Sequence, residues 1–112
     1  MKIRIKRVYE PAEKADGLRV LVDRLWPRGV KKTAIDLWLK DIAPSDELRN
    51  WFHHEAPKWA AFRRRYKKEL ADNPEAIAEL RRAARGKTVT LLYGARDTAH
   101  NQAVVIAEYL KG

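Results

Sequence analysis

Two apolar runs predict the central strands of a sheet. Residues 18–23 (LRVLVD) and 89–93 (VTLLY) consist almost entirely of aliphatic and β-branched residues, which is typical of strands buried on both faces. Near the start of the chain, Ile3 and Ile5 alternate with basic residues. This period of two predicts an outer strand with one solvent-exposed face. Residues 37–42 fit either a short edge strand or a turn of helix, and we favour the strand.

Helical signals fill residues 44–86 and return near the end. Ser45 follows a proline and precedes two acidic residues, so its hydroxyl can cap a helix whose first turn carries the favoured charge. A second helix is predicted after Pro57 and a third at Asn73-Pro74, because a cap residue followed by proline often begins a helix. Asp97 or Thr98 is expected to cap the last helix, which would place His100 and Asn101 in its first turn.

The order of these elements indicates the fold class. Two or three strands precede three helices, and one more strand and one more helix follow. Buried strands followed by helices favour a layered α/β domain, with a small, partly parallel sheet of three to four strands and about four helices. The chain has 112 residues, close to the usual size of one domain. We therefore predict a single domain over residues 1–112.

The positive charge of the chain is concentrated in one segment. The formal net charge is +9, and residues 58–87 hold ten basic residues against four acidic ones. Such a field attracts anionic ligands and polyanions, although a charged helix face more often keeps a protein soluble. A nucleic-acid-binding module is one alternative function, with these candidate contacts: Arg63, Arg64, Lys67, Lys68, Arg81, Arg82 and Arg85. A protein-interaction domain with a contiguous apolar patch is another.

Polar side chains follow both central strands, at the edge where α/β sheets bind ligands. If the two strands are neighbours, these side chains converge on one cleft. Guanidinium groups suit phosphate, sulfate or carboxylate, and a helix start also favours anions. We therefore predict a site for a small anion, built from Arg24, Arg28, Arg96, His100 and Asn101. Asp23 and His100 are the candidate catalytic residues, as a possible acid–base pair.

Several chemistries lack the residues that they need. The chain has no cysteine, which excludes thiol catalysis of the sulfurtransferase or phosphatase kind. Its three histidines have no metal-binding spacing such as HExxH, and glycine-rich nucleotide loops are absent, so we expect no metal and no cofactor. Whether the protein is an enzyme stays open. No apolar stretch is long enough for a signal peptide or a membrane span, and we expect a cytoplasmic protein with no membrane partner.

Four segments together resemble the YeaO-like family, short bacterial and archaeal proteins of unknown function. They are VLVDRLWPRG (20–29), WLKDIAPSDELRNWFHH (38–54), KWAAFRRRYKKEL (58–70) and TLLYGARDTAHNQAVVIAEYL (90–110). The resemblance covers nearly the whole chain and implies an α/β fold in the cytoplasm, but it supplies no accepted activity. A longer related branch has a cysteine where Tyr93 stands here, in a layout similar to rhodanese-like domains. The resemblance therefore implies an anion-binding geometry without the sulfur nucleophile.

Overall fold

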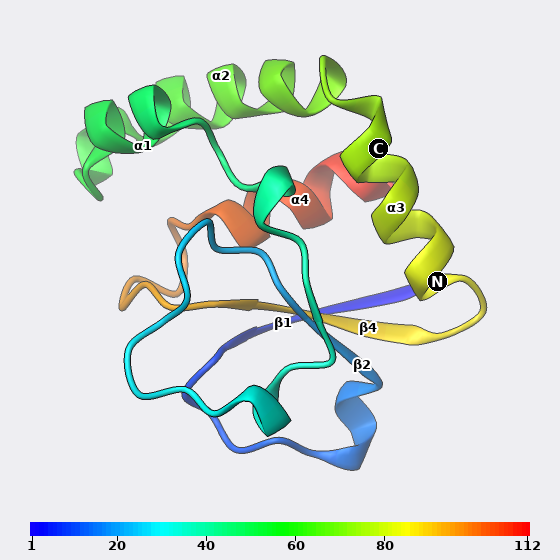
Figure 1. Cartoon of the computed structure of the whole chain (residues 1–112). Coiled ribbons are helices and arrows are strands. Elements are labelled where there is room, and N and C mark those ends of the chain that lie inside the picture. The colour runs from blue at the N-terminus through cyan, green and yellow to red at the C-terminus, as the bar shows by residue number, and fades with distance from the viewer.

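Four parallel strands build the centre of the structure, a computed structural model that describes residues 1–112 (Figure 1). The strands are β1 (Lys2–Arg7), β2 (Leu18–Leu21), β3 (Leu37–Trp38) and β4 (Thr88–Tyr93). They lie in the order β1-β4-β2-β3, and all three pairings are parallel. The α/β fold class is confirmed, with a sheet that is parallel throughout rather than in part. β1 is an outer strand, as its alternation predicted.

The four helices cover one face of this sheet. They are α1 (Asp46–Phe52), α2 (Trp59–Ala71), α3 (Pro74–Ala84) and α4 (Gln102–Lys111). α4 packs on β1 and β4, and α2 packs on the outer side of α4 with α1 beside it (Figure 1). Short 3₁₀ turns at Lys14–Asp16, Lys32–Ala34, Lys40–Ile42 and Ala56–Lys58 complete the chain.

The N-terminal cap of α1 agrees with the sequence prediction, and that of α4 differs from it. The Ser45 hydroxyl accepts a hydrogen bond from the backbone of Leu48 at 3.1 Å, as predicted. The prediction that Asp97 or Thr98 caps the last helix is wrong, because Asn101 caps it by accepting from the Val104 N–H at 3.2 Å. Asp97 instead accepts from the backbone of Ala99 and His100 and so stabilises a turn before the helix.

The segment at residues 37–42 contains both of the structures that its sequence allowed. Leu37 and Trp38 pair with β2, and the chain then makes a 3₁₀ turn at Lys40–Ile42. The backbone N–H of Leu39 still donates to the carbonyl of Leu21 at 3.0 Å. The strand prediction is therefore correct for the first two residues and wrong for the last three.

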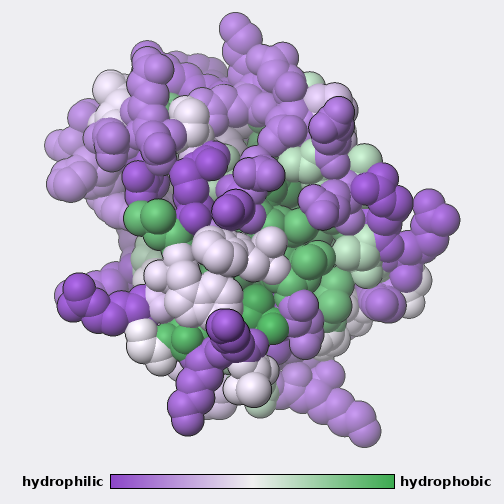
Figure 2. All heavy atoms as spheres, viewed as in Figure 1, coloured by the Kyte–Doolittle hydropathy of each residue, from purple (hydrophilic) through white to green (hydrophobic).

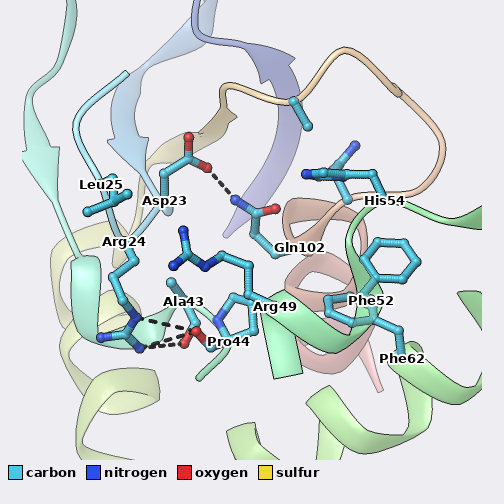
Figure 3. Close-up of a pocket in the computed structure, with 12 residues that line it drawn as sticks. Asp23, Arg24, Leu25, Ala43, Pro44, Arg49, Phe52, His54, Phe62 and Gln102 are labelled. Carbon is cyan, nitrogen blue, oxygen red and sulfur yellow. Dashed lines mark hydrogen bonds between the residues drawn. The ribbon is translucent and has the colours of Figure 1, made fainter. Parts of the chain in front are cut away.

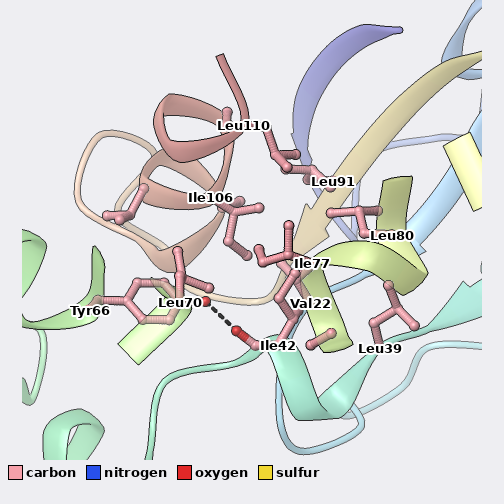
Figure 4. Packing of buried hydrophobic residues seen from close by; sticks show 14 of the residues in the cluster. Val22, Leu39, Ile42, Tyr66, Leu70, Ile77, Leu80, Leu91, Ile106 and Leu110 are labelled. Carbon is pink, nitrogen blue, oxygen red and sulfur yellow. Dashed lines mark hydrogen bonds between the residues drawn. The ribbon is translucent and has the colours of Figure 1, made fainter. Parts of the chain in front are cut away.

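The main hydrophobic core lies between the sheet and the helices (Figure 4). Val22 and Leu91 project from the sheet side, and Leu80 and Ile106 meet them from α3 and α4, all four fully buried. Tyr66 is also buried in this core, and its hydroxyl donates to the carbonyl of Ile42. A buried hydroxyl needs such a partner, because an unpaired one would lose the hydrogen bonds that it makes to water.

The opposite face of the sheet holds a buried ionic cluster. Asp16 is fully buried and accepts from Lys6 Nζ at 3.1 Å, from Arg19 Nη1 at 2.5 Å and from the backbone of Glu13 at 3.0 Å. Burial opposes the ionisation of Asp16, but these hydrogen bonds outweigh it and lower its pKa. The predicted solvent-exposed face of the first strand is thus wrong at Lys6, because the loop that carries Asp16 covers it.

Gly17 allows the loop of Asp16 to lie directly against β4. It has a φ of +63°, and a Cβ atom there would lie 2.2 Å from the carbonyl oxygen of Thr88. Gly29 also has a positive φ, +78°, but a Cβ atom there would meet nothing within 4 Å. Alanine substitutions at the two positions can therefore be compared: both carry the cost of a positive φ, and only the one at Gly17 adds steric overlap.

We predict that Gly17→Ala destabilises the protein much more than Gly29→Ala. Each substitution loses about 1 kcal/mol to the positive φ, and Gly17→Ala loses roughly 1–3 kcal/mol more because a backbone carbonyl cannot move aside easily. Urea denaturation of both variants and the wild type measures the difference. Equal losses would show that the Asp16 loop does not pack on β4 as described.

Candidate functional site

A cavity of about 170 Å³ lies at the carboxyl ends of β2 and β4 (Figure 3). The parallel pairing of these strands brings the residues after them together, and α1 and α2 form the remaining wall. The polar lining consists of Asp23, Arg24, Arg49, His54, Asn101 and Gln102. Phe52 and Phe62 form an apolar wall, with their rings stacked at 4.3 Å between centroids.

Asp23 joins the two strand ends. Its Oδ2 accepts from the backbone N–H of Gly94 at 2.9 Å, and its Oδ1 accepts from the side-chain amide of Gln102 (Figure 3). Burial raises the pKa of Asp23 to about 6, and these two hydrogen bonds only partly offset that effect. Asp23 can therefore change its protonation state near neutral pH, a property shared by many groups in functional sites.

Two arginines reach the cavity and use their hydrogen bonds differently. Arg24 donates to the carbonyls of Ala43 and Pro44 at 3.1–3.3 Å (Figure 3), so it fixes the loop before α1. Arg49 extends from α1 with its guanidinium towards the cavity. Its Nη2 binds the carboxylate of Asp46 at 3.1 Å, but its buried Nε–H has no hydrogen-bond partner. Arg49 thus lines the cavity with one donor of its guanidinium unused and enclosed, although the side chain as a whole is 42% exposed.

His54 lies at the rim of the cavity because of an unusual backbone at the end of α1. His53 and His54 have φ values of 44° and 54°, and both are thus left-handed. Each such residue costs roughly 1–2 kcal/mol when it is not glycine. Strained positions of this kind cluster at ligand-binding and active sites.

The structure brings together some of the predicted site residues and not others. Asp23, Arg24 and Asn101 line the cavity, although the buried Asn101 side chain is occupied in capping α4 and in donating to the carbonyl of Asp97 at 3.0 Å. Arg28, Arg96 and His100 are not among the lining residues. His100 instead contacts Asp97 at 2.9 Å, and its ring lies against Trp59. The group that reaches Asp23 is therefore Gln102 and not His100.

Three residues that line the cavity were not among the site residues predicted from the sequence. Arg49 and His54 lie on α1 and just after it, far along the chain from both strand ends, and only the packing of α1 brings them to the site. Gln102 follows the predicted residue Asn101 and carried no signal of its own. A helical projection from the Ser45 cap could have placed Arg49 one turn further along the same face.

The candidate nucleic-acid contacts lie on two helices. Arg63, Arg64, Lys67 and Lys68 belong to α2, Arg81 and Arg82 belong to α3, and Arg85 follows α3. Hydrophilic side chains dominate the upper, helical part of the view in Figure 2. Glu108 of α4 pairs with Arg63 at 2.6 Å and with Lys67 at 3.4 Å, which neutralises part of this charge. The nucleic-acid hypothesis stays a prediction.

The protein-interaction hypothesis has a candidate surface beside β3. Trp26 and Trp38 contact each other edge to face with their centroids 5.3 Å apart. Together with Val30 and Ile35 they line a shallow hollow at the edge of the sheet. Trp38 is 37% exposed, but its indole N–H donates to the Asp23 carbonyl at 2.7 Å. Trp38 thus supports the site, and a partner at this surface stays a prediction.

Neither a metal centre nor a membrane-spanning helix emerges from the structure. No three histidine, aspartate or glutamate side chains gather in a way that could hold an ion. None of the helices combines the length and the apolar character that crossing a bilayer requires.

Comparison with known proteins finds relatives over the full length of the chain. A family model described as "Inactive DUF488-N3 subclade" matches residues 2–112. The chain is 50% identical to the uncharacterised protein YeaO of Escherichia coli K12, over 99% of this chain and 98% of that protein. It is 43% identical to an uncharacterised protein of Mycobacterium tuberculosis H37Rv, over 99% and 95% of the two chains. No solved structure matches.

We predict that Asp23 makes folding less favourable as the pH rises. Its pKa is raised from an ordinary 3.8 to about 6, so the folded state holds a proton that the unfolded state releases. The protonated Asp23 side chain therefore favours the folded state. This contribution is fully present below the unfolded pKa and is lost as the pH rises through about 6. Between about pH 4.5 and 7.5 this amounts to about 2 kcal/mol.

The variant Asp23→Asn isolates this effect. The free energy of unfolding is measured by urea denaturation at both pH values. The loss of about 2 kcal/mol that Asp23 causes in the wild type as the pH rises should be absent from the variant. The difference between the two pH values removes any constant cost of the substitution. An identical pH dependence in both proteins would contradict a raised pKa at Asp23.

Proposed function

The chain belongs to the YeaO-like family, and we propose that it binds a small anionic molecule in the cavity at the ends of β2 and β4. The membership confirms the resemblance that the four sequence segments carried. The names of these relatives assign no function, so the proposal depends mainly on the chemistry of the cavity.

The observation that carries this proposal is the Nε–H of Arg49, which has no hydrogen-bond partner although Nη2 of the same guanidinium donates to Asp46. A buried N–H without a partner costs free energy, and a charged one costs more. Proteins rarely leave such a donor unused unless water or a ligand completes it. A carboxylate, phosphate or sulfate oxygen beside Nε would form a charge-assisted hydrogen bond, which is stronger than one between neutral groups.

The rest of the cavity supports a small organic anion rather than a large ligand. Its volume of about 170 Å³ lies below the roughly 300–1,000 Å³ of pockets for drug-sized molecules. Phe52 and Phe62 offer apolar surface opposite the polar groups. A molecule with one charged end and a short hydrocarbon part would satisfy both walls.

Binding without chemical conversion is the function that these residues favour. An acid–base pair needs two titrating groups within hydrogen-bond reach of the reacting atom, and Asp23 contacts an amide in place of His100. The description of the matching family model as inactive supports the same conclusion. We therefore assign Arg49 and Gln102 as ligand contacts. Asp23 is a group whose protonation state changes how strongly they bind an anion.

We predict that 4-methylpentanoate binds to the wild type at about pH 5 and that Arg49→Ala weakens this binding about tenfold or more, because a hydrogen bond to a charged group contributes roughly 1.5–3 kcal/mol. Isothermal titration calorimetry measures both dissociation constants. Acetate and inorganic phosphate, titrated in the same way, show whether the apolar wall contributes.

Arg64→Ala is the matched control. Arg64 is exposed on α2 and lies outside the cavity, so the variant loses the same charge without touching the site. It should bind 4-methylpentanoate as the wild type does. An equal loss in both variants would mean that the anion is attracted only by the overall charge of the protein, and the proposed site would be wrong.

A further inference from the structure

Asp23 is a partly buried carboxylate without a cationic partner. Its hydrogen bonds come from a backbone N–H and an uncharged amide. The two guanidinium groups that reach the same cavity pair with Asp46 instead. Its Oδ1 lies 3.8 Å from Nε of Arg24 and 3.1 Å from Nη2 of Arg49. Charges removed from water in proteins are normally paired, so the unpaired carboxylate of Asp23 could accept a cationic group of a ligand in this cavity.

Arg49 has an unused donor in the same cavity, although its Nη2 already pairs with Asp46. Its buried Nε–H lacks an acceptor, and Figure 3 shows its guanidinium and the Asp23 carboxylate on the polar side of one cavity. A ligand with one anionic and one cationic group would complete both residues at once. A simple anion would complete Arg49 only, and it would bring a second negative charge towards Asp23.

We propose that the ligand of this cavity is a small zwitterion of the α-amino-acid type, whose carboxylate binds Arg49 and whose ammonium group binds Asp23. This inference rests on the proposed anion-binding function. The amide oxygen of Gln102, which makes no hydrogen bond in the structure, is a further acceptor for the ammonium group. The stacked rings of Phe52 and Phe62 then face the side chain of the amino acid, and the small volume limits its size.

The proposal makes the effect of pH depend on the ligand. A zwitterion needs the ionised form of Asp23, so its binding strengthens as the pH rises. A simple carboxylate is repelled by that form, so its binding weakens over the same range. The other charged or titratable groups around this region are Arg7 on the carbonyls of Gly94 and Ala95, Arg24, Arg49, Asp46 beside both of these arginines, His54 and Tyr66. Because a histidine is among them, a variant of Asp23 is needed to assign the effect.

The experiment compares L-leucine with 4-methylpentanoate, which has the same skeleton without the ammonium group. 3-Methylbutylamine supplies the matching molecule without the carboxylate, and L-alanine with propanoate and L-valine with 3-methylbutanoate repeat the comparison at smaller size. Calorimetric titrations use the full chain at about pH 5 and about pH 7.5, on either side of the range in which Asp23 titrates. The proteins are the wild type, Asp23→Asn and Arg49→Ala.

We expect at least one amino acid to bind the wild type about tenfold more tightly at the higher pH than its partner carboxylate. Asp23→Asn should remove this preference and leave carboxylate binding in place, and Arg49→Ala should weaken both ligands. If carboxylates bind through Arg49 but no amino acid exceeds its partner, the zwitterion inference is wrong and the anion-binding function stands. If no carboxylate binds at either pH and no amino acid does, both are wrong. Circular dichroism of each variant confirms that it is folded.

Discussion

The parallel pairing of β2 with β4 is the constraint on which the rest of the structure depends. Val20 lies opposite Leu91, and the backbone N–H of Val22 donates to the carbonyl of Leu92 at 3.0 Å. Because both strands run in one direction, their carboxyl ends stop at the same edge. The hydrogen bond from Gly94 to Asp23 continues this pairing beyond the last ladder residue and fixes the floor of the cavity.

The two faces of the sheet are covered in different ways, and this positions the site. The helical face holds the main core, in which Val20, Val22 and Leu91 meet the helices. The other face is covered by a small apolar cluster of Val8, Leu21 and Leu92 and by the loop with Asp16, whose carboxylate accepts from Lys6 and Arg19. Breaking a buried ion pair of this kind is costly because it leaves the remaining charge uncompensated. The strands are thus held from both sides, and the cavity lies beyond their carboxyl ends.

Local pattern revealed the strands, the helices and half of the site. Apolar runs identified β2 and β4, and the Ser45 cap identified α1, because these signals act over a few residues. Asp23 could be placed at the edge of the sheet for the same reason. Arg49, His54 and Gln102 could not, since their position depends on how α1 packs and on where α4 begins. Lys6 was assigned to solvent because nothing local predicts that Asp16 covers it.

The proposed function places an anionic group in the cavity, close to the guanidinium of Arg49. Nuclear magnetic resonance of the arginine Nε–H groups tests it directly, during a titration of the wild type with 4-methylpentanoate at about pH 5, below the pKa of about 6 that burial gives Asp23. We expect the Arg49 signal to shift and reach saturation, while the signal of the exposed Arg64 stays in place. An Arg49 signal that does not move while other arginines respond would contradict it.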